Sequence, residues 1–487
     1  MATEIHYAPA HELIALLRER KISAVELLGV FERRHKEINP KLNAIVATDW
    51  DGARERARAA DARLARGETA PLLGLPITLK DAWEVAGMTT VCGSPALKDY
   101  RPKVTAPAVQ RLIDAGANPF GKTNTPLYCA DIQTYNNVFG VTNNPHDVAR
   151  TPGGSSGGAA AAVAAGLTAL ELGSDLAGSI RTPAHFCGVY GHKPTYGFVP
   201  YRGHIPGPPG TITEPDLVVA GPMARSAQDL ALALPLLAGP LPPAAHSLKL
   251  TLPPPRVGSL AEYRVAAWFD DPACELDVES RGLFEETASA LERAGARVTR
   301  GAPLGLTLEQ VYADFFFLMA SMIGDSLPGK QYRQARRFGN FMHLFGRDAP
   351  NTLAGFSHRA TCSHRQWAEA HERREQLRLK LEGYFREFDI LLMPVSTAPA
   401  PLHNTKGTPY ERTIEVNGRA QPYADQFKWI SLATLAGLPA TSAPVGRTRA
   451  GLPVNIQIVS AHGQDLSTID FARRLAERIG GYVAPPL

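Results

Sequence analysis

Two serines and one lysine carry the residue types that nucleophilic catalysis needs. Ser155 and Ser179 lie in short segments rich in Gly and Ser, GGSSGG at 153–158 and GSDLAGS at 173–179. Lys80 ends the apolar run GLPITLK at 74–80. Apolar surroundings favour the neutral form of a lysine, and a neutral amine beside a hydroxyl is a general base. The sequence therefore indicates a serine nucleophile that is activated by an amine.

The elements around these residues can position them. The Gly-rich loop is followed by the Ala run 159–165, which favours a helix, and by the apolar segment 167–172, which is short enough for a buried strand. A tight turn then leads to a helix with Pro183 in its first turn. We take Ser179, in that strand-to-helix turn, as the nucleophile, because the helix N-terminus adds positive potential there. The backbone N–H groups expected to bind an oxyanion are those of Leu176, Ala177, Gly178 and Ser179.

Four motifs together resemble the amidase signature family of amide hydrolases. They are GLPITLKD at 74–81, TPGGSSGG at 151–158, GSDLAGSIRTPA at 173–184 and CGVYGHKPT at 187–195. Weaker similarity continues to GLPVNIQIV at 451–459 and so covers nearly the whole chain. The resemblance implies an α/β fold, a single large domain over residues 1–487 with a central mixed, twisted β-sheet covered by helices on both faces.

Hydrophobic patterning divides that expected domain. The core motif region is 72–240, a Pro-rich surface loop follows at 239–255, and residues 256–487 complete the sheet and the substrate pocket. Apolar spacing predicts the helices 8–20, 23–38 (with Ser23 as N-cap), 51–67, 104–116, 226–237, 277–294, 311–322, 363–387 and 467–479. It predicts strands at 118–122, 264–269, 296–299, 390–393 and 454–459.

The resemblance also implies roles for individual residues. Ser179 attacks the amide carbon, Ser155 relays the proton and Lys80 is the general base, with a cis peptide bond between Gly154 and Ser155. Three further residues are expected to support the site structurally, namely Ser156, Asp175 and Arg181. Substrate-binding candidates come mainly from the polar and aromatic loop 128–137 and are Tyr128, Cys129, Asp131, Gln133 and Ile180.

Three segments depart from the family pattern. Leu176-Ala177-Gly178 stands where the family usually has Thr-Gly-Gly, Leu127 stands where a Glu is usual, and Asn455 replaces a Gly. The added methyl of Ala177 changes the acyl site, and Leu127 removes a carboxylate. None of these departures touches the serines or the lysine, so they bear on the substrate and leave the reaction class unchanged.

Other interpretations compete for the same residues. Lys80 could be an ion-pair partner of Asp81 or Asp175. The glycine-rich loop also fits G-x-S-x-G, which would make Ser155 the nucleophile of an α/β-hydrolase, but that motif needs a preceding strand and NNPHDVARTP forms turns. The loop lacks the Lys-Ser/Thr ending of a phosphate-binding P-loop.

Histidine and cysteine offer further alternatives. His185 or His192 could serve a Ser–His–Asp triad, although a lone histidine near a helix is more often structural. Cys129 could be a reactive thiol, but no cation is adjacent in the sequence to support that. We therefore keep the serine and lysine set.

Composition excludes several classes of protein. The 487 residues carry a formal net charge of +4 and no long Lys/Arg block, so we expect no nucleic-acid partner. Five scattered cysteines form neither a disulfide framework nor a paired metal site, which favours the cytoplasm, and we expect no metal or cofactor. The sequence contains no run of about 18 apolar residues, the length that a membrane-spanning helix needs. We expect a small-molecule amide substrate and a monomer or homodimer.

Three functions remain open at this stage. The favoured one is an amidase that cleaves a small or medium carboxamide, with esters as further substrates. The alternative is the glutaminase-type subunit of a tRNA-dependent amidotransferase, which works with partner subunits. The third is a non-catalytic scaffold on the same fold, which the intact lysine and serine set argues against.

Overall fold

A single sheet of eleven strands runs through the molecule, in a computed structural model that describes residues 4–487. In spatial order the strands are β1 (Ile45–Thr48), β3 (Asn118–Thr123), β2 (Pro76–Lys80), β6 (Leu170–Asp175), β8 (Val219–Ala224), β7 (Tyr190–Lys193), β14 (Ala440–Arg447), β15 (Pro453–Val459), β11 (Ile390–Pro394), β9 (Arg264–Ala267) and β10 (Arg297–Arg300). Two small hairpins, β4 (Tyr135–Asn136) with β5 (Gly140–Val141) and β12 (Thr413–Val416) with β13 (Arg419–Pro422), lie outside it.

The sheet is mixed, and both parts of the chain contribute to it. β3, β2 and β6 are parallel to one another, as are β11, β9 and β10, whereas the strands between β6 and β11 pair antiparallel. The strand β7 from the first half of the chain pairs with β14 from the second half. The loop 239–255 therefore connects segments that share one sheet.

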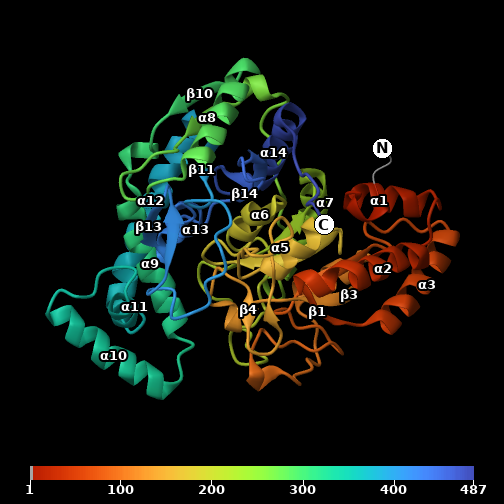
Figure 1. Ribbon diagram of the computed structural model, residues 1–487, viewed down its shortest axis with the longest axis horizontal. Coiled ribbons are helices and arrows are strands. Elements are labelled where there is room, and N and C mark those ends of the chain that lie inside the picture. The colour runs from red at the N-terminus through yellow and green to blue at the C-terminus, as the bar shows by residue number, and fades with distance from the viewer. Residues whose placement is uncertain (1–3) are drawn as a thin grey trace.

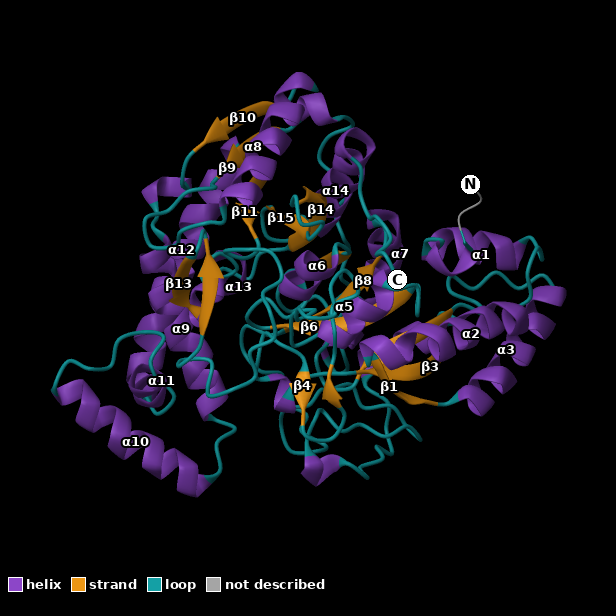
Figure 2. Cartoon of the chain, in the orientation of Figure 1, coloured by secondary structure: helices purple, strands orange, loops and turns teal. Residues whose placement is uncertain are grey.

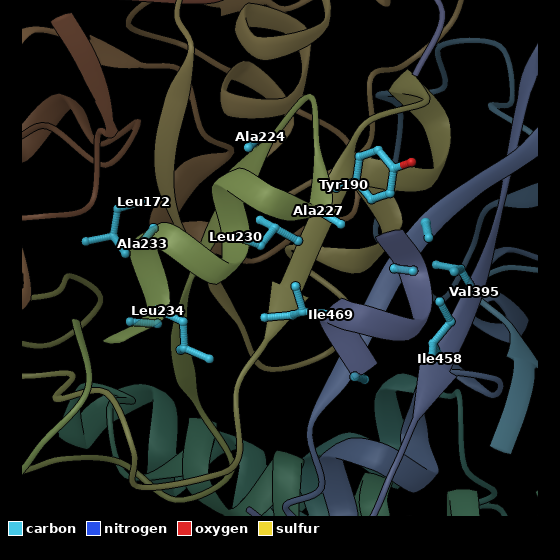
Figure 3. Close-up of a cluster of buried hydrophobic side chains, with 14 of the residues drawn as sticks. Leu172, Tyr190, Ala224, Ala227, Leu230, Ala233, Leu234, Val395, Ile458 and Ile469 are labelled. Atoms are coloured by element: carbon cyan, nitrogen blue, oxygen red, sulfur yellow. The ribbon is translucent and has the colours of Figure 1, made fainter. Parts of the chain in front are cut away.

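Helices cover both faces of this sheet, as the family resemblance implied. Met223 and Ala224 are neighbours in β8, so their side chains point to opposite faces. Met223 packs with α5 (Gly157–Ala164) and α6 (Arg181–Cys187) in one buried cluster. Ala224 belongs to the main core with α7 (Ala227–Leu237) and α14 (Asp465–Ile479), which Figure 3 shows in close-up. The helices around the central strands are seen in Figure 2.

The remaining helices gather at the two ends of the sheet (Figure 1). At one end lie α1 (Ala10–Arg18), α2 (Ala24–Leu42) and α3 (Trp50–Ala65), and at the other end lie α8 (Val278–Arg293), α9 (Leu308–Gly324), α10 (Gly329–Leu344), α11 (Leu353–Arg359) and α12 (His364–Glu387). The short helices α4 (Pro107–Asp114) and α13 (Ser431–Leu435) complete the set. No helix in residues 4–487 is both long enough and apolar enough to cross a membrane.

The predicted helices are present within a few residues of their expected bounds. Ser23 caps α2 as predicted, because its hydroxyl accepts from the Glu26 N–H and the Glu26 carboxylate accepts from the Ser23 N–H. The strand predicted at 167–172 instead occupies 170–175.

The sequence patterns did not predict β8. Its residues VAGPMA include Gly221 and Pro222, which usually argue against a central strand. Gly221 is required there, since a Cβ at this position would lie 2.1 Å from the His192 carbonyl oxygen of the neighbouring strand.

Glu171 of β6 predicts a measurable pH dependence of stability. Its buried carboxyl accepts hydrogen bonds from the hydroxyls of Thr78 and Thr123. Burial raises the pKa of Glu171 from 4.5 to about 8, even though those hydrogen bonds and nearby lysines lower it. Because the folded-state pKa is raised, this group's contribution to stability is full below pH 4.5 and is lost as the pH rises through about 8.

We therefore expect Glu171→Gln, which cannot ionise, to flatten the fall of Tm between about pH 5 and about pH 9 and to melt above wild type at the alkaline end. Scanning fluorimetry across this range measures the effect. The exposed residue Glu286 provides the control, since Glu286→Gln should keep the wild-type slope. An unchanged slope in Glu171→Gln would contradict the prediction.

Candidate active site

The structure brings Lys80 and Ser155 into direct contact. Lys80 is the last residue of β2 and is completely buried. Its Nζ donates to Ser155 Oγ at 2.6 Å and to Ser174 Oγ at 2.8 Å. Ser155 lies in the loop before α5, and Ser174 lies in β6, the strand next to β2. The Gly154–Ser155 peptide bond is cis, as the resemblance implied.

The ion-pair interpretation of Lys80 is wrong. The carboxylate of Asp81 lies 3.6 Å from Lys122 Nζ, and the carboxylate of Asp175 pairs with Arg181 at 2.8 Å. Within residues 4–487, Lys80 forms no ion pair. Its Nζ donates to two serine hydroxyls, which is the arrangement that a base acting on a hydroxyl requires.

Ser179 lies in the turn between β6 and α6, as the motif predicted. Only 8% of this residue is exposed, and in the described part of the chain its hydroxyl makes no hydrogen bond. The Ser156 N–H donates to the Ser179 carbonyl oxygen at 3.2 Å, so the Gly-rich loop and the turn are in contact. Ser156 Oγ also lies 3.4 Å from both the N–H and the carbonyl oxygen of Ser174. Ser156 thus fastens the loop to the end of β6.

Asp175 holds the turn from inside. Its carboxylate accepts from the N–H groups of Gly178 at 2.9 Å and Ile180 at 3.1 Å and from the guanidinium of Arg181. Burial alone would raise the pKa of Asp175, but the charge and hydrogen bonds of Arg181, the Lys193 charge and the Ile180 N–H bring it down to about 2. The carboxylate therefore stays ionised and keeps its bonds to the turn.

Arg181 ties the same turn to the second part of the chain. Its guanidinium donates to the Ile430 carbonyl oxygen at 2.9 Å, to Gln457 Oε1 at 2.6 Å and to Thr434 Oγ1 at 2.7 Å. With the Asp175 pair, these bonds satisfy a charged side chain that is completely buried. The position of Ser179 thus depends on contacts from both parts of the chain.

The four backbone donors expected for an oxyanion are not equivalent. The Gly178 N–H is already bonded to Asp175 Oδ1. Gly178 has φ +92°, and a Cβ there would lie 2.6 Å from Thr182 Oγ1, so the turn requires glycine at this position. Within residues 4–487 the N–H groups of Leu176, Ala177 and Ser179 make no hydrogen bond. These three remain available to a ligand.

The substrate-binding candidates separate into two groups. Tyr128 is 39% exposed and Cys129 partly exposed, and the Cys129 thiol lies near Lys80 and Ser155. Asp131 instead pairs with Arg412 at 2.6 Å and accepts from the Tyr423 hydroxyl.

The other two candidates are enclosed. Gln133 exchanges two hydrogen bonds with the backbone of Asn404. Ile180 is fully buried in the cluster between α5, α6 and the sheet, so its side chain packs in the core beneath the turn and is not exposed to a substrate.

The two histidines considered for a triad make other contacts. His185 lies between the Ala398 carbonyl oxygen and the Asn455 N–H, and burial lowers its pKa to about 4. His192 lies between Thr441 and Asp465. Both ring nitrogens of each histidine are already hydrogen-bonded to these partners, and neither ring bonds to Ser179, so the geometry favours a structural role for both.

Sequence reasoning missed Ser174 and Cys92. Ser174 lies inside the third motif, and alternation along β6 could have shown that its side chain points away from that of Asp175. Cys92, whose thiol lies 3.6 Å from that of Cys129, follows an irregular segment and carried no signal in the sequence.

Comparisons with known proteins agree with this geometry. The model of the family described as Amidase matches residues 26–469. A glutamyl-tRNA(Gln) amidotransferase subunit from Thermus thermophilus is 34% identical over 94% of this chain and 94% of its own length. The corresponding protein from Bdellovibrio bacteriovorus is 30% identical over 96% of each chain. A solved bacterial aryl acylamidase of the amidase signature enzymes superposes with a TM-score of 0.80 at 27% identity, covering 98% of this chain and 97% of that one.

The family match and the solved neighbours together define an amide hydrolase. The chain belongs to the amidase family, and it is an enzyme that hydrolyses amide C–N bonds. The family resemblance and the α/β fold inferred from the four motifs are both confirmed.

The expected partners are corrected by these relatives. The expectations from the sequence are a small-molecule amide substrate, no nucleic acid, no membrane, and a monomer or homodimer. The relatives that match over 94–96% of this chain are named as subunits of an amidotransferase for glutamyl-tRNA(Gln). A formal net charge of +4 excludes no such partner, because net charge does not show how basic residues are grouped on a surface.

Proposed function

We propose that this chain is the glutaminase-type amidase subunit of a tRNA-dependent amidotransferase and releases ammonia from a carboxamide through an acyl-enzyme on Ser179. The observation that carries the chemistry is the bond from Lys80 Nζ to Ser155 Oγ at 2.6 Å, with no carboxylate paired to the lysine in residues 4–487. The relatives at 30% and 34% identity over nearly the full chain support the assignment to an amidotransferase.

The proton path follows from the contacts of the lysine. As the free amine, Lys80 takes a proton from Ser155, which takes one from Ser179 as the Ser179 oxygen attacks the amide carbon. Ser155 then returns a proton to the departing nitrogen. Water attacks the resulting ester by the same relay and regenerates Ser179. The hydroxyls of Ser155 and Ser179 must come into hydrogen-bond contact in the substrate complex, as catalytic bonds often do only then.

The oxyanion of each tetrahedral intermediate would bind to free backbone N–H groups. Leu176, Ala177 and Ser179 offer them, while the Gly178 N–H serves the turn through Asp175. One such donor typically contributes about 10²–10³-fold to kcat. Of the four donors expected from the sequence, this proposal keeps three.

A second candidate is a hydrolase that acts on a carboxamide other than glutamine. The solved aryl acylamidase at a TM-score of 0.80 favours it, as do Leu127 in place of a carboxylate and the methyl of Ala177 at the turn. Both candidates share the same three catalytic residues. We also keep a cytoplasmic location within the proposal, supported by five free thiols.

Ammonia release distinguishes these candidates. The chain is assayed with glutamine alone, with the partner subunits encoded by the same organism plus tRNA, and with an anilide substrate. The proposal predicts that partners and tRNA raise ammonia release from glutamine at least about tenfold, an effect that Ser179→Ala abolishes. Fast anilide hydrolysis by the isolated chain, with glutamine untouched under every condition, would replace the first candidate by the second.

A further inference from the structure

Two thiols face each other beside the Lys80–Ser155 contact. The Sγ atoms of Cys92 and Cys129 are 3.6 Å apart, and they lie 3.6 Å and 3.9 Å from the carbonyl oxygen of Ile205. Cys92 is buried and Cys129 is partly exposed. A disulfide holds its sulfurs about 2.05 Å apart, so this pair is reduced but needs only about 1.5 Å of closure to bond.

The backbone holds the two cysteines in register. The Tyr128 N–H donates to the Cys92 carbonyl oxygen at 2.9 Å, and Ser94 Oγ donates to the Tyr128 hydroxyl at 2.8 Å. Cys92 has φ +48° and Cys129 has φ +59°, a region that residues other than glycine rarely adopt. Such conformations persist only where the surrounding structure fixes them, and they cluster at functional sites.

The two thiols have opposite environments. Burial alone would raise the pKa of Cys129, but the neighbouring Cys92 thiol and the nearby Lys80 and Ser155 side chains bring it down to about 6. Burial and the neighbouring Cys129 raise the pKa of Cys92 well above its usual value. Cys129 thus has the features of an attacking thiolate. Cys92 stays protonated, and its place 3.6 Å away makes it the thiol that can resolve an oxidised Cys129. Lys80 is distant from Cys129 in the sequence, but the fold brings the two side chains close together.

We propose that Cys129 and Cys92 form a peroxide-sensitive pair that switches the enzyme off by closing a disulfide beside Lys80. The Cys129 thiolate attacks hydrogen peroxide, the O–O bond breaks, and a sulfenic acid and hydroxide form. The Cys92 sulfur then attacks the Cys129 sulfur, and the S–S bond forms as the sulfenic oxygen leaves as hydroxide. That hydroxide takes the Cys92 proton and becomes water. In total the two sulfurs lose two electrons, and the two oxygens of the peroxide end as one water and one hydroxide.

Closure of the disulfide disturbs the catalytic contact. The Cys129 sulfur leaves Lys80 and Ser155, and the segment 126–130 moves toward Cys92. A displacement of about 1 Å near a catalytic group can cost about 10²-fold in rate. The loss of activity rests on the proposed role of Lys80, whereas the formation of the disulfide does not. Disulfides are rare in a reducing compartment, and those that form there are usually transient, redox-sensing bonds of this kind.

Peptide mapping and activity test the switch together. The full-length reduced enzyme is treated with hydrogen peroxide, quenched with catalase and mapped without reductant. We expect a cross-link between the peptides that contain Cys92 and Cys129, with a loss of about 2 Da, which is two hydrogens removed. We also expect amide hydrolysis to fall by at least about tenfold and to return with dithiothreitol.

Three variants separate this pair from general oxidation. Cys129→Ala should make the residual activity insensitive to peroxide. Cys92→Ala should leave Cys129 carrying one or two added oxygens, with losses that dithiothreitol reverses only in part. Cys362→Ala removes a partly exposed thiol elsewhere and should behave as wild type.

The outcomes are distinguishable from those of the proposed function. A disulfide that forms without any change in activity would overturn the switch. Oxidation of Cys362 with Cys92 and Cys129 untouched would overturn the reactive pair itself. If no amide is turned over, the cross-link remains visible by mass, so failure of the proposed function leaves this measurement intact.

Discussion

Ser179→Ala should reduce kcat for amide hydrolysis by about 10⁴-fold or more, with the fold intact. The substitution removes the oxygen that forms the acyl-enzyme. Free N–H groups remain at Leu176 and Ala177, so substrate binding and a small residual rate should persist. Because the Ser179 hydroxyl makes no hydrogen bond within residues 4–487, its loss leaves no partner unsatisfied and should shift Tm little.

A fluorophosphonate that reacts with activated serines provides the matched measurement. Wild type should carry one label, on the peptide that contains Ser179, and Ser179→Ala should carry none. Ser155 and Ser156, which lie nearby in the Gly-rich loop, should stay unlabelled in both enzymes. A label on Ser155 would show that the G-x-S-x-G interpretation deserved preference and that the nucleophile is misassigned.

The four motifs predicted the fold well because they fix the centre of the sheet. The GLPITLK run forms β2, and the GSD of the third motif ends β6, the next strand. Local patterns could not predict β8, which carries Gly and Pro in its interior, because close packing against β7 overrides the propensity of those residues. The segment 325–360 also escaped prediction. The apolar residues Phe341, Leu344 and Phe345 at the end of α10 are exposed, so their spacing does not indicate a buried helix face.

The residues of the candidate site were likewise predicted only in part. Lys80 and Ser155 were predicted because motif residues meet at the ends of adjacent elements. Cys92 was not, since its approach to Cys129 depends on a loop path that no periodicity encodes. Asp131 looked like a substrate ligand in the sequence, yet it is bonded to Arg412 from a distant segment. A sequence shows which side chains are polar, but it does not show which of them are already satisfied by partners far along the chain.

Lys80→Ala should lower kcat by about 10³-fold, within the range for removal of a general base. Lys80→Arg should fail to restore activity, because an arginine keeps its proton at any pH that the protein survives. An arginine variant with near wild-type rates would show that the lysine serves as a positive charge and does not act as a base.

The two serines bonded to Lys80 allow a sharper version of this experiment. Ser155 Oγ and Ser174 Oγ accept from the same Nζ at 2.6 Å and 2.8 Å, so Ser155→Ala and Ser174→Ala each remove one acceptor. Only Ser155 lies in the Gly-rich loop that contacts Ser179, through the Ser156 N–H. If the proton passes through Ser155, its loss should cost about 10²-fold or more in kcat, whereas the loss of Ser174 should cost about tenfold or less. Equal losses would mean that both hydroxyls merely orient the lysine, and the proton would then need another path to Ser179.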